Sequence, residues 1–281
     1  MILCTKMNGN GNDFLVINNM DLKYSGETLS GYTKALCRRR ESLGADGILV
    51  VEPSDIYDFK MRLFNRDGTE GEMCGNGARC VARYAFIKGI VNKPEMAFET
   101  LDGRVDAGVK GTRATLRLSP VDISNLVQDV PASVEGYDFS YTFLTVGVPH
   151  AVIFEKNRLD TEDLYRKIGR AIRLRRDLFP EGANINFVSP KEAYETGLDV
   201  LTYERGVEDL TLSCGTGSIA SAIAAFSAGL TGPVVDVYNP GGLNRVSLVF
   251  GPSGKLLPEL EGGASYIAEI EASEEALDQY N

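Results

Sequence analysis

The chain contains the segment Cys74-Gly-Asn-Gly-Ala-Arg-Cys-Val-Ala-Arg-Tyr-Ala-Phe-Ile-Lys-Gly-Ile90 and, further on, the related segment Cys214-Gly-Thr-Gly-Ser-Ile-Ala-Ser-Ala-Ile-Ala-Ala-Phe-Ser-Ala-Gly-Leu230. Their Cys, two Gly, two Ala, Phe and last Gly coincide at one offset, 214 − 74 = 140 positions. Upstream, Phe64-Asn65-Arg66 matches Tyr203-Glu204-Arg205 in the same order. Such ordered matches indicate a duplicated domain, because solenoid repeats have periods of roughly 20–50 residues.

Both segments predict helices, over Cys74–Lys88 and Cys214–Ala228, because small residues dominate and a Gly follows at the C′ position. Apolar residues surround both helices almost completely, so each is expected to be buried as the core of its own half. Amphipathic surface helices are predicted at Thr28–Arg39 and Thr161–Leu174.

Runs in which apolar and polar residues alternate, bounded by Gly, Pro and Asp turns, predict strands. They cover Ile48–Val51, Phe59–Phe64, Ala97–Thr100, Arg113–Leu118, Ala151–Phe154 and Val246–Phe250. The expected fold class is therefore α+β, with two pseudo-symmetric domains, each a mostly antiparallel β-sheet or barrel wrapped around a central helix.

The domain boundary is predicted near Ser119-Pro120, where a strand ends and the second copy has not yet begun. The N-terminal domain then covers residues 1–118 and the C-terminal domain residues 119–263. The final segment, 264–281, contains a possible strand at Ser265–Ile270 and is expected to return to the first domain.

The composition excludes several classes of function. The chain has 281 residues, 29 Lys plus Arg and 39 Asp plus Glu, and the net charge of −10 disfavours a polyanionic partner such as nucleic acid. Its longest apolar stretch, Ile219–Leu230, is shorter than the roughly 20 residues of a membrane helix. Met1–Phe14 lacks the features of a signal peptide, so a cytoplasmic location is expected, with no membrane partner.

The chain has five cysteines without close CxxC pairs and one histidine, His150. An odd number of dispersed cysteines argues against a disulfide framework or a zinc knuckle, so reduced thiols and no metal site are expected.

A cysteine at a helix N-terminus lies where the helix dipole favours an anion, which lowers the thiol pKa. Cys74 and Cys214 both have this predicted position, and the glycines that follow would let a carboxylate approach the backbone N–H groups. If both halves close on one ligand, one thiolate can remove an α-proton while the opposite thiol protonates the other face. The pattern therefore predicts inversion of an α-carbon in a small amino-acid substrate without a cofactor.

The motif series as a whole resembles that of the diaminopimelate epimerase family, in order and spacing along nearly the whole chain. It consists of Lys6-Met7-Asn8-Gly9-Asn10-Gly11-Asn12-Asp13-Phe14, Phe64-Asn65-Arg66-Asp67-Gly68, Met73-Cys74-Gly75-Asn76-Gly77-Ala78-Arg79-Cys80, Pro149-His150, Gly182-Ala183-Asn184, Glu204-Arg205-Gly206 and Ser213-Cys214-Gly215-Thr216-Gly217. The resemblance implies interconversion of LL- and meso-diaminopimelate in lysine and peptidoglycan biosynthesis, without pyridoxal phosphate, by a homodimer.

The resemblance also implies roles for individual residues. The catalytic pair would be Cys74 and Cys214. His150 and Glu204 would orient the site, and Arg205 would hold the distal carboxylate. The implied substrate-binding residues are Asn12, Asn65, Gly75, Asn76, Asn184, Glu204, Arg205, Gly215 and Thr216.

Three features depart from the family pattern. Asn8 stands where the family usually has His, and Val148 stands where an Asn that touches the distal end of the substrate is usual. The loop Val207–Ser213 is about one residue longer than expected from the resemblance. Val148 cannot make the hydrogen bond of an Asn, so these departures bear on specificity at the distal end.

Simpler interpretations apply to several residues. Cys4, Cys37 and Cys80 are expected to be small buried apolar residues, as unpaired cysteines often are. His150 can equally be a core histidine whose hydrogen bonds are satisfied. The Arg38-Arg39-Arg40 run, and likewise Arg173, Arg175 and Arg176, are interpreted as solvated helix ends that complement the helix dipole, with no assigned function.

Two other functions remain open on the sequence. One is a racemase or isomerase of the same fold acting on another amino acid, such as histidine, proline or hydroxyproline. Arg205, Asn65 and Asn184 favour a substrate with a second charged end, because an apolar substrate would leave them unpaired. The other is a ligand-binding protein whose two cysteines form a thiol redox switch.

Overall fold

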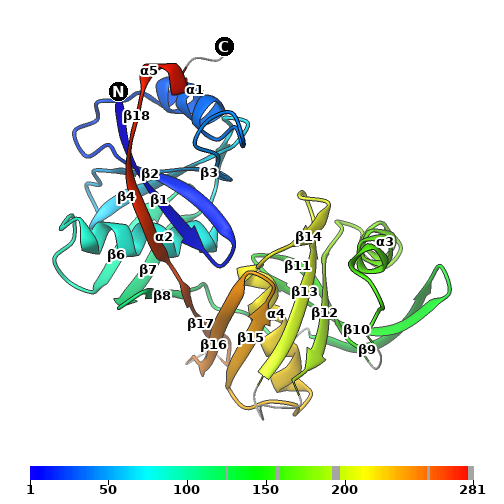
Figure 1. The fold of residues 1–281 in the computed structure, drawn as a ribbon. Coiled ribbons are helices and arrows are strands. Elements are labelled where there is room, and N and C mark those ends of the chain that lie inside the picture. Colours follow the sequence, from blue (N-terminus) through cyan, green and yellow to red (C-terminus); the bar gives the residue numbers. More distant parts are fainter. Residues whose placement is uncertain (125, 156–157, 192–196, 252–253, 278–281) are drawn as a thin grey trace. The chain divides into compact units, whose positions relative to one another are not determined.

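The computed structural model describes residues 1–124, 126–155, 158–191, 197–251 and 254–277. The chain forms two compact units, Met1–Arg117 together with Glu261–Asn281, and Leu118–Leu260. Each unit combines strands and helices of its own (Figure 1). In the described ranges, no helix is both long and apolar enough to span a membrane. Of the segment 264–281, which is expected to join the first domain, residues 278–281 lie outside the described part.

The first unit is a mixed sheet with helices on its faces. Its elements are β1 (Ile2–Gly9), β2 (Asn12–Asn18), α1 (Gly26–Leu36), β3 (Gly47–Glu52), β4 (Phe59–Asn65), β5 (Glu70–Gly71), α2 (Gly75–Ile87), β6 (Glu95–Thr100), β7 (Gly103–Lys110), β8 (Arg113–Arg117), β18 (Ser265–Ala272) and α5 (Glu274–Leu277). Neighbouring strands are antiparallel except for the pairs β2–β3 and β4–β6.

The second unit repeats this order. Its elements are β9 (Val127–Val134), β10 (Tyr137–Val146), β11 (Val148–Phe154), α3 (Glu162–Arg173), β12 (Asn184–Pro190), β13 (Gly197–Glu204), β14 (Asp209–Thr211), α4 (Gly215–Ser227), β15 (Val234–Asn239) and β16 (Gly242–Phe250), and β17 (Leu256–Gly263) runs on into the first unit. The parallel pairs are now β11–β12 and β13–β15. Parallel neighbours need a crossover connection, and in both units a helix lies in each crossover.

The predicted α+β class with two pseudo-symmetric halves is confirmed, and the sheets are antiparallel apart from those parallel pairs. One edge strand comes from a different part of the chain in the two units. In the second unit, the strand beside β10 is β9, which directly precedes it in the chain. In the first unit, the equivalent place beside β1 is taken by β18 from the C-terminal end of the chain. The two copies therefore complete the same edge with strands from different parts of the sequence.

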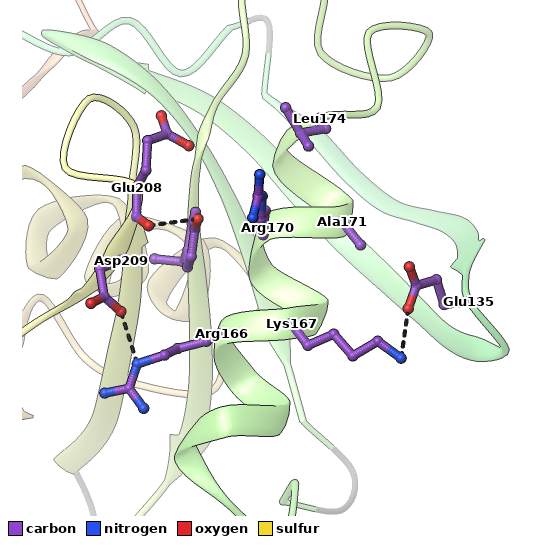
Figure 2. Close-up of a pocket in the computed structure, with 9 residues that line it drawn as sticks. Glu135, Arg166, Lys167, Arg170, Ala171, Leu174, Glu208 and Asp209 are labelled. Carbon is purple, nitrogen blue, oxygen red and sulfur yellow. Dashed lines mark hydrogen bonds and ion pairs between the residues drawn. The ribbon is translucent and has the colours of Figure 1, made fainter.

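Alternation along the strands places two helices on opposite faces of the second sheet. Val152 packs with α4, whereas its neighbours Ala151 and Ile153 pack with α3. Successive side chains of a strand point to opposite faces, so α3 and α4 cover different sides. Beside α3, a groove of about 560 Å³ lies along β13, β14 and the β9–β10 turn (Figure 2).

Helix α1 differs from its prediction at both ends. Ser25 caps it, with its Oγ accepting a hydrogen bond from the Thr28 backbone N at 3.2 Å, so the helix begins before Thr28. It ends at Leu36, whose carbonyl accepts a hydrogen bond from Gly44 N at 2.9 Å as the chain turns back. The predicted end at Arg39 is wrong because this turn, which a helical pattern does not reveal, replaces the last helical turn.

Candidate active site

The two central helices begin at the predicted cysteines. Cys74 is the N-cap of α2, with φ −133° and ψ 120°, and Cys214 is the N-cap of α4, with φ −108° and ψ 116°. Gly89 and Gly229 follow the helices in the left-handed region, at φ +68° and +71°. Each cysteine therefore lies at the positive end of a buried helix dipole.

Beside Cys74, a chain of side-chain amides connects α2 to the sheet. Asn76 donates its Nδ2 to Asn12 Oδ1 at 2.6 Å, and Asn12 donates its Nδ2 to Asp46 Oδ2 at 3.1 Å. Arg39 binds the Asp46 carboxylate at 2.8 Å and the Asp13 carboxylate as well. Arg39 is half-exposed, but it lies beyond the end of α1 and anchors the acid that Asn12 contacts, so its interpretation as a helix end without a role is wrong.

Asn65 lies apart from this amide chain. It is exposed at the end of β4, where its Nδ2 donates to Thr69 Oγ1 at 3.1 Å. Gly75 follows Cys74 directly as the first residue of α2 and is half-buried. The structure thus brings Asn12 and Asn76 together and leaves the Asn65 side chain to its own turn.

In the second unit, Cys214 is packed tightly at the start of α4. Its Sγ accepts a hydrogen bond from Gly217 N at 3.3 Å and lies 3.5 Å from Thr216 Oγ1. A Cβ on Gly217 would lie 2.5 Å from Asn186 Oδ1, so only glycine lets this turn approach β12 so closely. Gly215 is the first residue of the helix. A Cβ added at this position would lie 3.0 Å from the Leu260 side chain.

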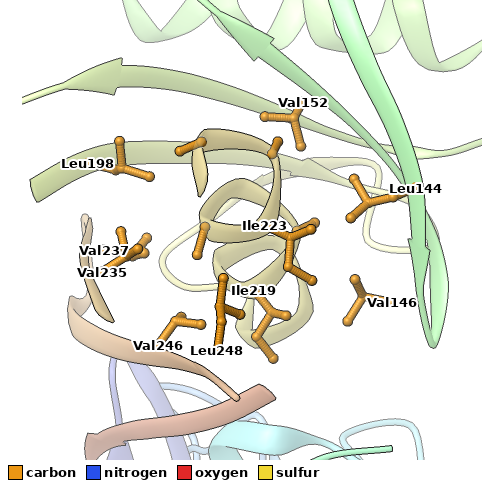
Figure 3. Packing of buried hydrophobic residues seen from close by; sticks show 14 of the residues in the cluster. Leu144, Val146, Val152, Leu198, Ile219, Ile223, Val235, Val237, Val246 and Leu248 are labelled. Atoms are coloured by element: carbon orange, nitrogen blue, oxygen red, sulfur yellow. The ribbon is translucent and has the colours of Figure 1, made fainter. Parts of the chain in front are cut away.

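The rest of α4 is fixed by an apolar core. Ile219 and Ile223 point from the helix into a shell of aliphatic side chains contributed by several strands (Figure 3). The shell includes Leu144, Val146, Val152, Leu198, Val235, Val237, Val246 and Leu248. Because this interior is closely packed, the helix terminus and Cys214 have one well-defined position.

The second unit also gathers the remaining predicted polar residues near the end of β13. Asn184, which is buried, accepts a hydrogen bond from Arg205 N on its Oδ1 at 2.7 Å. The Arg205 guanidinium donates to the Glu181 carbonyl at 2.9 Å. Burial raises the pKa of Glu204, and the neighbouring Thr211 and Cys214 side chains partly offset this effect. The carboxyl group of Glu204 therefore lies near the Cys214 thiol.

His150 is completely buried in β11. Asn186 Nδ2 lies 3.2 Å from His150 Nδ1, while Asn186 Oδ1 accepts from Thr202 Oγ1 at 3.0 Å. Since Asn186 must donate to it, Nδ1 is the unprotonated ring nitrogen and Nε2 carries the proton. Burial is the main cause that lowers the pKa of His150 to about 3; the hydrogen bond from Asn186 opposes this shift and the charge on Arg205 adds to it.

We therefore expect the His150 ring to stay neutral throughout the physiological range. As pH falls from the unfolded pKa of about 6.5, the unfolded chain binds a proton that the folded chain refuses, so this group lowers stability between that pH and about 3. NMR checks this directly, because the chain has one histidine. Its ring signals should not move between about pH 5 and 8, and a midpoint near 6.5 would contradict the expectation.

The other three cysteines, Cys4, Cys37 and Cys80, are unreactive near neutral pH. Burial raises the pKa of the Cys4 thiol to about 11 and of the Cys37 and Cys80 thiols to about 12. A thiol needs its thiolate form to react, so these residues behave as small apolar core groups. All five cysteines lie in the described part of the chain, and none of them takes part in a disulfide.

The arginines at the C-terminal end of α3 differ in part from their interpretation as solvated helix ends. Arg173 is paired with Glu208 at 2.5 Å, and only 11% of its side chain is exposed. Arg175 is paired with Asp177, and Arg176 donates to the Pro180 carbonyl at 2.9 Å. These arginines therefore brace the loop that leads to Gly182 and Asn184.

The groove beside α3 is a weaker candidate for a site. Its cations are largely neutralised, with Arg166 bound to Asp209 at 2.9 Å and Lys167 bound to Glu135 at 3.0 Å (Figure 2). Neither Cys214 nor Arg205 lines it. Across the described ranges, no group of three or more His, Cys, Asp or Glu side chains is arranged to hold a metal ion.

Three residues of these networks were not predicted. Asp46 holds Asn12, Asn186 contacts His150, and Arg79 is fully buried inside α2. Each is a polar residue at a position whose neighbours are buried. Such a break in an apolar pattern is a usable sequence signal, because buried polar groups require partners.

Comparison with known proteins adds to this geometry. The chain matches the family profile "Diaminopimelate epimerase" over residues 4–121 and 142–249. It is 39% identical to the diaminopimelate epimerase of Caldanaerobacter subterraneus subsp. tengcongensis over 85% of this chain and 89% of that protein. It is 37% identical to the diaminopimelate epimerase of a Hydrogenobaculum species over 94% of this chain and 99% of that protein.

A similar fold occurs among solved structures. A PhzF-family phenazine biosynthesis protein from Bacillus anthracis superposes with a TM-score of 0.71 at 14% identity, covering 97% of this chain and 99% of that protein. At this identity, the likeness concerns the fold alone.

Proposed function

The chain belongs to the diaminopimelate epimerase family, and on this premise we propose that it interconverts LL- and meso-2,6-diaminopimelate by proton transfer at the α-carbon. It is an amino-acid epimerase of a family that works without pyridoxal phosphate. The observation that carries the proposal furthest is the equivalent position of Cys74 and Cys214, each the N-cap of the central helix in its own copy of the fold.

In the proposed mechanism, one cysteine reacts as thiolate and the other as thiol. The thiolate takes the α-proton from one face of the carbon, and the thiol gives its proton to the opposite face. The substrate leaves inverted and the two cysteines have exchanged protonation states, so protons and charge balance over one turnover. This requires both thiols to reach the same α-carbon.

Negative charge passes onto the substrate α-carboxylate as the proton leaves. Backbone N–H groups at the two helix N-termini, at Gly75 and Asn76 and at Gly215 and Thr216, are the donors we assign to it. Donors held in place before the reaction stabilise such charge without reorganisation. The hydrogen bond from Gly217 N to Cys214 Sγ, 3.3 Å long, would stabilise the thiolate that Cys214 becomes after it has given up its proton.

The polar residues of each unit are assigned to the rest of the substrate. Asn12, Asn65 and Asn184 are proposed to bind its polar groups, and Arg205 to bind the distal carboxylate. Glu204, which lies near Cys214, and His150, connected through Asn186 to the first turn of α4, are proposed to orient the site.

The biological setting follows from the same premise. We propose a role in lysine and peptidoglycan biosynthesis, in the cytoplasm, with a homodimer as the working form. None of these features is needed for the chemistry assigned to the two cysteines, so they stand as separate proposals.

The competing substrate is another amino acid handled by the same fold, such as histidine, proline or hydroxyproline. Incubation in D₂O with LL-diaminopimelate and with each competitor distinguishes them, because two-base inversion introduces deuterium at the α-carbon. We expect incorporation into diaminopimelate at a kcat/KM well above that of every competitor. Faster exchange into a substrate without a distal carboxylate would reassign the substrate, and no exchange into any amino acid would favour the redox-switched binding protein.

A further inference from the structure

Arg79 is a cation buried inside the central helix of the first unit. Its side chain is completely shielded from solvent. Its Nη2 donates to Asn76 Oδ1 at 2.7 Å, and its Nε reaches the Gly263 carbonyl at 3.4 Å. Its Nη1 is buried with no hydrogen-bond partner in the described part of the chain. The hydrogen-bond partners of this guanidinium are therefore neutral oxygens.

A buried guanidinium without a counter-ion is costly, because desolvation penalises the charged form. Burial lowers the pKa of Arg79 to about 10, while the charges of Cys80 and Cys74 raise it and that of Arg113 lowers it. Cys80 supplies no negative charge near neutral pH, since burial raises its pKa to about 12. Cys74, about one and a half helical turns before Arg79, is the remaining source of a compensating anion.

Other charged groups on the elements around α2 are already engaged. Arg113 of β8 is paired with Glu261 at 2.5 Å, and Lys6 of β1 with Asp13 at 2.6 Å. Arg83, one turn further along α2, donates to the backbone carbonyls of Gly111 and Ala264. Neither carboxylate of these pairs is among the groups whose charge acts on Arg79.

Arg79 also fixes the direction of the amide chain described above. A guanidinium can only donate, so Asn76 must turn its oxygen toward Arg79 and its nitrogen toward Asn12. A carboxylate can only accept, so Asn12 must turn its nitrogen toward Asp46. With a donor at one end and an acceptor at the other, neither amide can flip without breaking two hydrogen bonds.

The second unit has no cation at the equivalent position. The residue at the position of Arg79, 79 + 140 = 219, is Ile219, which is fully buried and apolar. The group near Cys214 is instead the Glu204 carboxyl group. The two copies of the fold thus place opposite electrostatic groups near their cysteines.

We propose that Arg79 is a positioning residue of the first half of the site, acting as the built-in counter-ion of a Cys74 thiolate and orienting Asn76 and Asn12. This rests on the proposed function only in taking Cys74, Asn76 and Asn12 as site residues. Cys74 is then the thiolate of the resting protein, and Arg79 acts through it and through the two amides without touching substrate.

The test is the pH dependence of Cys74 alkylation, which needs no substrate and so is independent of the proposed reaction. Iodoacetamide labelling of the full chain from about pH 6 to 10, followed by peptide mass spectrometry, gives the Cys74 midpoint. We expect Arg79→Met to raise the Cys74 midpoint by about one pH unit. At a fixed pH below the midpoint, this corresponds to a roughly tenfold lower rate of Cys74 alkylation. Arg83→Met, on the same helix, should leave it unchanged.

Arg79→Lys and Arg79→Gln keep the proposal testable if the Met variant does not fold. The Lys variant retains the charge, so its Cys74 midpoint should stay near that of the parent, whereas the Gln variant should shift upward. In substrate kinetics, the Lys variant should raise KM more than it lowers kcat, because the Lys ammonium group does not hold the Asn76 side chain as the planar Arg guanidinium does. Equal midpoints in the Lys and Gln variants, or a Met variant that only loses thermal stability, would overturn the proposal.

Discussion

Cys74→Ala and Cys214→Ala should each abolish epimerisation in both directions, with a loss of at least about 10³-fold in kcat. Inversion by two bases needs a proton acceptor on one face and a donor on the other, and each substitution removes one of them. The measurement is conversion of LL-diaminopimelate to the meso isomer, and the reverse, by each purified variant. Circular dichroism and Tm establish that the variants are folded.

Cys80→Ala is the matched control. It removes a thiol from the same helix as Cys74, but this thiol is fully buried and burial raises its pKa to about 12. The variant should keep parental turnover even if the small cavity lowers its Tm. Turnover retained in either Cys74→Ala or Cys214→Ala would rule out the two-cysteine mechanism.

The second large effect concerns the distal end of the substrate. Arg205→Leu should reduce kcat/KM for diaminopimelate on the order of 10- to 100-fold, because a hydrogen bond to a charged group contributes about 1.5–3 kcal/mol. A neutral amino acid without a distal carboxylate should lose far less. Comparing kcat/KM of both substrates in parent and variant isolates the contribution of that carboxylate.

Arg170→Leu provides the control for this substitution. It removes an arginine from the same unit, in the α3 groove that Arg205 does not line. It should change neither substrate's kcat/KM. Equal losses on both substrates in Arg205→Leu would mean that Arg205 supports the fold of its loop and does not select the substrate.

Several features could be predicted because they depend on neighbouring residues alone. The capping cysteines and the C′ glycines place both ends of α2 and α4, and the observed bounds agree with the prediction. Helix α3 also agrees, since Thr161 caps it and its apolar stripe has a helical period. The prediction of helix α1 was wrong at both ends, because Ser25 caps the helix before Thr28 and the turn that joins Gly44 N to the Leu36 carbonyl ends it before Arg39.

The partners of buried polar groups could not be predicted in the same way. Asn12 and Asn76 stand 64 positions apart and Asn12 and Asp46 stand 34 apart, yet they form one hydrogen-bonded chain. The interaction of His150 with Asn186, and the resulting neutral ring, depends on the pairing of β11 with β12. From the sequence alone, His150 could equally be a core histidine or a residue of the site.

The duplication, the α+β class, the two capping cysteines and the family could all be read from the sequence, because each depends on local patterns or on matches at a constant offset. Three features depend on packing between distant segments: β18 completes the first sheet, Arg39 anchors Asp46, and Arg79 is fully buried in α2, where Ile219 takes the same place in the second copy. The physical reason is that burial and hydrogen bonding depend on which distant segments pack together. An arginine in a helical pattern becomes informative only once the surrounding structure has removed it from water.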